Sequence, residues 1–316
     1  MGYAEYFNLE REPFSNAPND RFFFNSEQHN QALLRLMYSV DSNKGLAVLV
    51  GGVGTGKTTL ARRMLDNLTL DKYESSLLVM IHSGITPEWL LSRIALQLGV
   101  KSPDTDPLKI LKQLYERLLQ IHHEGRRAVV LIDEAQMLQS RELMEEFRGL
   151  LNLEIPGKKL LNVVFFGLSE LEQTMKLDEP LAQRVAVKYT LKPLSAETTH
   201  SYIAHRLHVA GSNDVLFEES AIDKIHKCAG GVPRLINTIA DNALFETFLR
   251  HDKIVSEKIV DSVSEDLGLS KPEVFPVDEA VVAGPVENSI VVSPTEEDTH
   301  EDLEAIDSML EGFKEG

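Results

Sequence analysis

The chain has 316 residues, of which 43% are hydrophobic, and carries a formal net charge of −17. This length accommodates two ordinary domains, or one α/β domain with an appendage. The single cysteine, Cys228, excludes an internal disulfide framework. The first residues lack the basic and apolar regions of a secretory signal, and no apolar run approaches the roughly 20 residues that span a bilayer. These features predict a cytoplasmic protein with no membrane span.

The first 44 residues are rich in aromatic side chains and end in a helical pattern over residues 27–39. We expect residues 1–44 to form a segment and helix that pack on the domain that follows. Packing in a core is the favoured role of the aromatic side chains, and contact with a nucleotide base is the minority interpretation.

A short apolar run over residues 46–50 leads directly into Gly-Gly-Val-Gly-Thr-Gly-Lys-Thr at 51–58. This is the GxxxxGK[ST] phosphate-binding loop, placed between a strand and a helix. Glycines let successive backbone N–H groups face a polyphosphate, and the helix adds its positive N-terminal partial charge. Lys57 is expected to reach the β- and γ-phosphates, and Thr58 to ligate Mg²⁺. The sequence therefore predicts binding of ATP and Mg²⁺ through Gly52, Val53, Gly54, Thr55, Gly56, Lys57, Thr58 and Thr59.

Apolar runs of strand length alternate with helical patterns through residues 45–192. This alternation is typical of a parallel sheet covered by helices on both faces, so we predict a three-layer αβα domain. The expected strands are residues 46–50, 77–81, 129–132, 162–166 and 186–191. The expected helices are residues 58–68, 87–98, 107–122 and 141–153, with Asp106 and Ser140 as N-caps.

The strand over residues 129–132 ends in two acids, Asp133 and Glu134. Ligands of open α/β folds bind at the carboxyl edge of the sheet, where these carboxylates are expected to lie. Asp133 suits a Mg²⁺ ligand, and Glu134 suits the group that orients and polarises an attacking water.

Beyond residue 192 the pattern is helical only, with expected helices at residues 195–210, 218–229, 232–250 and 256–267. Ser195 is the expected cap of the first. We predict a small all-α domain over residues 193–268.

Residues 269–316 are expected to form a disordered acidic tail. Residues 271–316 contain 13 acidic and 2 basic residues. One face of a short terminal helix would carry the apolar residues Leu303, Ile306, Met309, Leu310 and Phe313. Such a helix either docks on the body of the protein or folds into the groove of a partner.

Two arginines are candidates for balancing charge on a γ-phosphate. Arg184 precedes the last strand, and Arg234 begins a helix of the all-α domain. Spacing alone leaves solvated surface arginines as the alternative for both.

Several motifs together resemble an AAA+ ATPase with an origin-recognition-like helical lid. They are the phosphate-binding loop, Ile132-Asp133-Glu134-Ala135-Gln136, Leu181-Ala182-Gln183-Arg184 and Gly231-Val232-Pro233-Arg234. The N-terminal pattern, which runs from Tyr6-Phe7 through Pro13-Phe14 to Phe22-Phe23-Phe24-Asn25-Ser26-Glu27-Gln28-His29, resembles the ATPases of the general secretion pathway protein A (ExeA) type.

This resemblance implies roles for the two arginines. The chain also departs from the family pattern at one position. Arg184 matches the arginine finger that reaches the γ-phosphate of a neighbouring protomer, which implies a homo-oligomer. Arg234 matches the lid arginine, or sensor 2. Leu168 stands where a polar sensor 1 residue is typical, so this role falls to Ser169 or is absent.

Three functions follow as hypotheses. The leading one is an oligomeric ATPase of the bacterial cytoplasm that assembles or positions an envelope machine of the type II secretion or pilus type, with the acidic tail contacting a membrane-bound protein partner. The alternative is a DNA-binding regulator of the TniB type, which is not favoured because no strong basic cluster stands out. The third is a nucleotide-gated switch with slow turnover, which Leu168 motivates.

Overall fold

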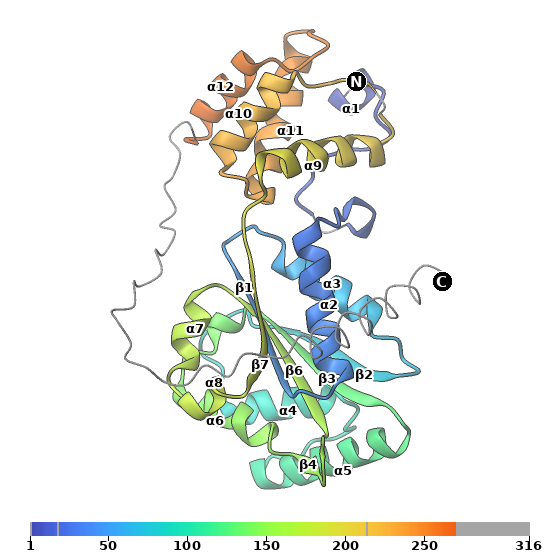
Figure 1. The fold of residues 1–316 in the computed structure, drawn as a ribbon, viewed down its shortest axis with the longest axis vertical. Helices are drawn as coiled ribbons and strands as arrows, with labels where there is room; N and C mark the ends of the chain where they lie inside the picture. The colour runs from blue at the N-terminus through green and yellow to red at the C-terminus, as the bar shows by residue number, and fades with distance from the viewer. Residues whose placement is uncertain (1, 18, 213, 270–316) are drawn as a thin grey trace, which may run out of the picture. The chain divides into compact units, whose positions relative to one another are not determined.

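The computed structural model describes residues 2–17, 19–212 and 214–269 (Figure 1). Its centre is a five-stranded sheet with the strand order β2-β3-β6-β1-β7, in which every neighbouring pair is parallel. The strands are β1 (Leu46–Gly51), β2 (Tyr73–Val79), β3 (Arg127–Asp133), β6 (Leu161–Gly167) and β7 (Val185–Leu191). Because the strands are parallel, their carboxyl ends meet at one edge, where ligands bind in open α/β folds.

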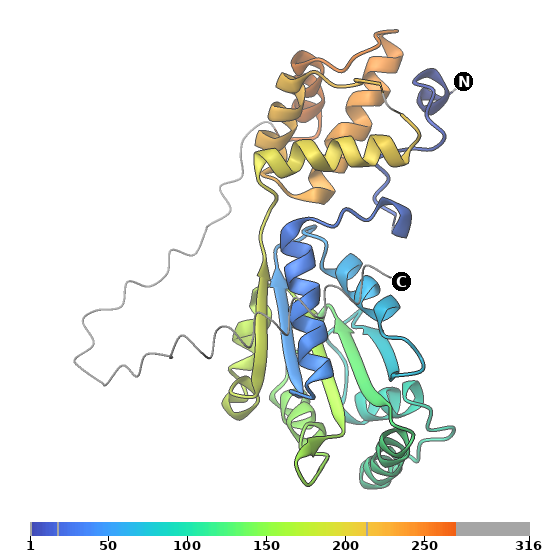
Figure 2. The ribbon, with the colours of Figure 1, turned by 45° about the vertical axis from the view of Figure 1, so that its right-hand side comes forward.

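Helices cover both faces of this sheet. On one face lie α2 (Glu27–Asp41) and α3 (Lys57–Asn67), and Figure 2 shows α2 running beside β1 and β7. On the other face lie α4 (Pro87–Gln97), α5 (Pro107–His123) and α6 (Arg141–Leu150). Side chains of β1 alternate between the two cores, with Leu46 in one and Ala47 in the other, as the two-residue period of a strand requires.

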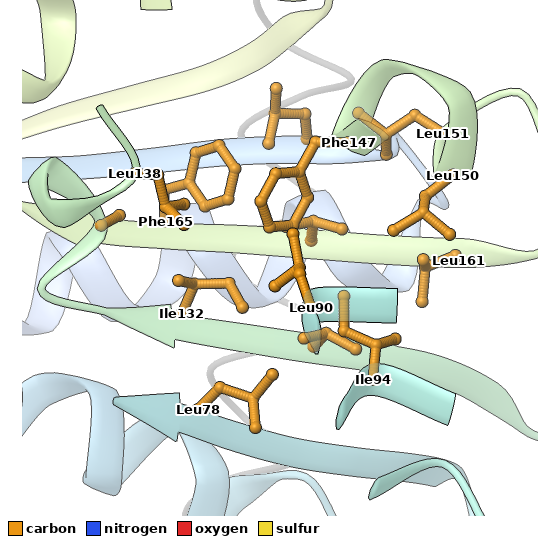
Figure 3. Packing of buried hydrophobic residues seen from close by; sticks show 14 of the residues in the cluster. Leu78, Leu90, Ile94, Ile132, Leu138, Phe147, Leu150, Leu151, Leu161 and Phe165 are labelled. Atoms are coloured by element: carbon orange, nitrogen blue, oxygen red, sulfur yellow. The ribbon is translucent and has the colours of Figure 1, made fainter. Parts of the chain in front are cut away.

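Figure 3 shows the core between the sheet and α4 and α6. Phe147 of α6 meets Phe165 of β6 edge to face, with ring centroids 4.9 Å apart. Both rings are fully buried. Truncating either one to alanine would cost about 3–5 kcal/mol, so this contact helps to fix α6 against the strand that precedes Leu168.

Four further helices follow the sheet: α9 (Ala196–Val209), α10 (Glu219–Ala229), α11 (Pro233–Leu249) and α12 (Glu257–Asp266). We call them the helical domain. The predicted α/β fold with a parallel sheet followed by helices is confirmed, and Asp106, Ser140 and Ser195 each cap a helix as expected. Among the described residues, none of the helices combines the length and apolarity that crossing a membrane requires.

The N-terminal segment differs from the sequence-based expectation. Residues 2–24, which we call the arm, include α1 (Tyr3–Tyr6) and the 3₁₀ turn η1 (Asp20–Phe22). The arm buries Tyr3, Phe7, Phe14 and Phe22 in the core of the helical domain, and only α2 and Phe23 join the core of the sheet. The expectation that all of residues 1–44 pack on the αβα layers was therefore wrong for the aromatic part. Aromatic residues need an apolar core, but their type does not determine which core they enter.

Other differences are local. Strand β2, at the edge of the sheet, begins at Tyr73 rather than at residue 77. The prediction began too late because the polar residues Glu74, Ser75 and Ser76 interrupt the apolar run. The two-stranded hairpin β4 (Glu154–Ile155) and β5 (Lys158–Lys159) and the short helices α7 (Glu170–Met175) and α8 (Glu179–Ala182) were not predicted. A polar element of two to six residues leaves little periodicity in a sequence.

Candidate nucleotide-binding site

The loop between β1 and α3 forms a cradle of backbone atoms at the carboxyl edge of the sheet. The Thr55 hydroxyl donates to the Gly52 carbonyl at 2.9 Å, which closes the turn. Gly54 and Gly56 have φ angles of +75° and +101°, a region that favours glycine. A Cβ on Gly54 would lie 2.8 Å from Cβ of Arg234, so helix α11 occupies the space that a side chain would need.

The Lys57 side chain lies inside this cradle, and the residue is 6% exposed. Its ammonium group donates to the carbonyl oxygens of Gly51 at 3.0 Å and Gly52 at 2.8 Å. Burial lowers the pKa of Lys57, and the nearby carboxylates of Glu134 and Asp133 oppose that shift. The buried cation is thus held by two neutral carbonyl oxygens, which an anionic phosphate oxygen can replace.

Asp133 ends β3 and is 1% exposed. Its Oδ1 accepts from the Glu134 amide at 3.0 Å, whereas its Oδ2 is buried with no hydrogen-bond partner among the described residues. Burial raises the pKa of Asp133, and the neighbouring Thr58 hydroxyl and Glu134 amide oppose the rise. A buried carboxylate oxygen without a donor beside a threonine hydroxyl fits a hard divalent cation such as Mg²⁺, because such a cation prefers oxygen ligands.

Glu134 follows in a left-handed conformation, with φ 55° and ψ 38°. This turn directs the chain into the 3₁₀ helix η2 (Ala135–Met137) and leaves Glu134 partly exposed, on the wall of a pocket. The Gln136 side-chain amide donates to Glu134 Oε2 at 2.6 Å.

The pocket has a volume of about 270 Å³. It is lined by the phosphate-binding loop, by the arm and by the helical domain, including Phe22, Phe23, Phe24, Tyr202, Arg206 and Asn237. An aromatic and amide-rich wall facing a phosphate-binding cradle is a surface on which a flat base and its ribose can lie. The aromatic residues 22–24 therefore serve both as core and as pocket wall.

His29, which the sequence did not single out, connects α2 to the phosphate-binding loop. Its Nε2 lies 3.3 Å from the Thr55 carbonyl oxygen and its Nδ1 lies 2.6 Å from the Ser26 hydroxyl. Because a carbonyl only accepts, Nε2 carries the proton and Nδ1 accepts from Ser26. Burial lowers the pKa of His29, which favours this neutral form.

Arg206 joins the arm to the helical domain beside the pocket. It is 6% exposed and donates to the carbonyl oxygens of Pro13 at 2.5 Å and Ser15 at 3.0 Å, and to the Tyr202 hydroxyl at 2.8 Å. The Tyr202 hydroxyl donates in turn to Asn237. The arm wall of the pocket is thus fastened to α9 and α11.

Known proteins resemble this chain in sequence and in fold. Residues 40–175 match the AAA domain family. The chain is 38% identical over 275 residues to the General secretion pathway protein A of Aeromonas hydrophila, a match that covers 86% of this chain. The chain has an AAA domain in the parallel-sheet fold of AAA+ proteins. The resemblance to the general secretion pathway protein A type is confirmed, although the match covers only 48% of the length of that relative.

Solved structures of AAA+ proteins share the fold. The ORC2 protein of Aeropyrum pernix in its ADPNP-ADP complexes superposes with a TM-score of 0.61 at 18% identity, over 81% of this chain and 71% of that one. Cdc6p from Pyrobaculum aerophilum gives a TM-score of 0.63 at 17% identity, over 80% of this chain and 70% of that one. At such identities the likeness concerns the fold alone.

The candidate residues that the sequence predicted fall into two groups, according to whether they lie at the pocket. Lys57, Thr58, Glu134 and Arg234 line the pocket together with most of the phosphate-binding loop, and Asp133 lies behind them with its buried carboxylate. Leu168 also lines the pocket, whereas Ser169 is exposed and its hydroxyl donates to Glu170 at 3.4 Å.

Arg184 does not reach the pocket. It lies between α8 and β7 and donates to the Arg148 carbonyl at 3.4 Å. Arg148 in turn pairs with the buried Asp178 at 2.9 Å. A role for Arg184 at this site would thus require a second protomer.

Three residues at the site were not predicted from the sequence: His29, Arg206 and Gln136. His29 is the last residue of the N-terminal family pattern, and Gln136 is the last residue of Ile132-Asp133-Glu134-Ala135-Gln136. Their positions in these two motifs were the only sequence signal for them. Arg206 lies in a helix with no recognisable motif, and only its burial distinguishes it.

Proposed function

We propose that this AAA+ chain binds ATP together with Mg²⁺ and hydrolyses it to ADP and phosphate. The observation that carries the proposal is the convergence of Lys57, Glu134 and Arg234 on one pocket from three separate parts of the chain. A phosphate-binding loop alone would support binding only. A carboxylate beside it supplies the means to activate water.

Each group has a distinct part in this proposal. Lys57 exchanges its carbonyl partners for phosphate oxygens, and Arg234 offsets charge on the γ-phosphate. Thr58 and Asp133 hold Mg²⁺, which when bound neutralises phosphate charge. Glu134 orients the attacking water and accepts its proton.

Arg184 is proposed to act across a subunit boundary, on the γ-phosphate of a neighbouring copy. Its position outside the pocket of its own chain supports this. Arg184→Ala should bind ATP but not hydrolyse it. Mixing it with Glu134→Gln should restore part of the turnover at mixed interfaces, and no recovery at any mixing ratio would count against action in trans.

Two variants test the reaction itself. Lys57→Ala should lose ATP binding, because no other lysine of the described residues lines the pocket. Glu134→Gln should bind ATP normally and turn it over roughly 100-fold more slowly, the range that loss of a general base produces. Equal turnover by Glu134→Gln and the unmodified chain would overturn the proposal.

A slow nucleotide-gated switch is the second candidate, and Leu168 favours it. This side chain lines the pocket but has no polar atom to hold a water. A measurable but low turnover that is still lost in Glu134→Gln would identify such a switch, and rapid turnover would exclude it.

The similarity to General secretion pathway protein A supports a role in assembling or positioning an envelope machine. We propose that the acidic tail, which lies outside the described residues, contacts a membrane-bound partner. Deleting residues 303–316 should abolish recruitment to that partner and spare turnover. Salt-sensitive DNA binding that depends on ATP would instead favour the TniB-type alternative.

A further inference from the structure

We propose that Gln136 is a positioning residue that sets the direction of the Glu134 carboxylate and ties it to the end of β6. This inference rests on the proposed hydrolysis, since it assigns a residue that acts through Glu134. It starts from two hydrogen bonds made by one side chain. Gln136 donates to Glu134 Oε2 at 2.6 Å, and it accepts from the Leu168 amide at 3.0 Å.

The direction of the Gln136 amide follows from its partners. The backbone N–H of Leu168 can only donate, so the Gln136 oxygen faces it. The amino group must then point toward Glu134, whose ionised carboxylate can only accept. Gln136 is 7% exposed, and its amide is satisfied at both ends. Neither glutamate nor leucine could replace it here without leaving a buried polar group unpaired.

The hydrogen bond from Gln136 engages only one of the two carboxylate oxygens of Glu134. Oε2 accepts from Gln136, so Oε1 is available for a water in the pocket. Glu134 and Lys57 both line the pocket. Without the amide, the carboxylate would be free to turn toward the ammonium group and form an ion pair that occupies both. Gln136 therefore keeps the base and the phosphate-binding cation apart.

The second contact reaches the position where a polar sensor is missing. Leu168 has no polar side-chain atom, but its backbone amide reaches Glu134 through Gln136. Gly167 makes room for this, because a Cβ there would lie 3.0 Å from the Gln136 Oε1 and 2.9 Å from the Leu171 Cδ2. The end of β6 is thus hydrogen-bonded to the Glu134 carboxylate through the Gln136 side chain.

The test compares steady-state turnover of the full chain with that of Gln136→Ala and Gln136→Met, the second of which keeps the volume of the side chain and removes both hydrogen bonds. Both variants should lower kcat roughly 10- to 100-fold, the effect of a misplaced catalytic group, and change KM and the Kd for ATP less than twofold. Gln139→Ala is the matched control, since Gln139 is exposed and outside the pocket, and should leave kcat unchanged.

A double variant separates positioning from a general structural effect. Because Gln136 acts through Glu134, adding Gln136→Met to Glu134→Gln should lower the residual kcat no further. A drop of the same factor in both backgrounds would overturn the assignment, as would a raised Kd for ATP with unchanged kcat.

If Glu134→Gln turns over as fast as the unmodified chain, the proposed hydrolysis fails and the assignment with it. If it is slow but Gln136→Met is normal, only the assignment fails.

Discussion

The backbone amide of Arg234 donates to the carbonyl oxygen of Gly54 at 3.3 Å. The donor is one of the first amides of α11, which have no partner within their own helix, and the acceptor belongs to the phosphate-binding loop. The Arg234 side chain lines the same pocket. A change in the loop around a phosphate therefore alters a main-chain contact of the helical domain.

Gly54→Ala should weaken ATP binding at least tenfold. The new Cβ would lie 2.8 Å from Cβ of Arg234 and 3.0 Å from Cγ1 of Val232, so the loop and α11 must separate. Gly125→Ala is the control for backbone strain, because its φ is +76° and its Cβ would meet nothing within 4 Å. It should cost about 1 kcal/mol of stability and leave affinity intact. Titration with a fluorescent ATP analogue measures the affinity of each variant. Equal affinities for Gly54→Ala and Gly125→Ala would contradict the steric argument.

Replacing His29 should change how stability depends on pH. Burial lowers the pKa of His29 below its ordinary value of 6.5, so the unfolded chain takes up a proton at a higher pH than the folded one. The contribution of His29 is therefore complete above pH 6.5 and is lost as the pH falls through and below that value, with a slope of at most about 1.4 kcal/mol per pH unit. Urea unfolding from pH 7.5 to 5 should show a steeper decline for the unmodified chain than for His29→Gln. Parallel curves would mean that His29 is protonated equally in both states.

Mg²⁺ affinity should fall on acidification at a higher pH than for an ordinary aspartate. Metal binding needs the ionised carboxylate, and burial raises the pKa of Asp133. Asp133 thus loses its charge earlier as the pH is lowered. Calorimetric titration of Mg²⁺ into the ATP-bound protein should show this loss. Asp133→Asn should bind the ion more weakly, with a flatter pH profile between pH 7 and 4.5, and an unchanged profile would exclude Asp133 as the titrating ligand.

Arg206→Ala should destabilise the fold and loosen the arm. The substitution leaves the carbonyl oxygens of Pro13 and Ser15 without their donor, at a cost of about 1–3 kcal/mol each. Arg250→Ala serves as a matched control in the same domain, because Arg250 is half exposed and, within the part of the chain that the structure describes, forms an ion pair with Glu246 alone, four residues earlier. It should change stability by less than about 0.5 kcal/mol. Denaturant unfolding checks both, and proteolysis within residues 2–24 should accelerate only in Arg206→Ala.

Much of the sheet and of the phosphate-binding loop could be predicted from the sequence, because the relevant signals are contiguous. β1 reads as an apolar run, and the loop that follows needs only consecutive backbone amides and glycines. Asp133 and Glu134 could be placed at the same edge because parallel strands bring their carboxyl ends together. β2 was located only in part, since an edge strand with polar residues lacks that run.

The remaining parts of the site depend on contacts between residues far apart in the chain. His29 and Thr55, Gln136 and Leu168, and Arg206 and Pro13 are joined by single hydrogen bonds over 26, 32 and 193 residues. No local pattern encodes such pairs, because the partners are backbone carbonyls and amides that every residue carries. By itself, the sequence predicted that a triphosphate is held and by which loop. Only the tertiary structure decided which core the aromatic arm enters, which side chain directs Glu134 and where Arg184 lies, since these depend on how the chain brings distant segments together.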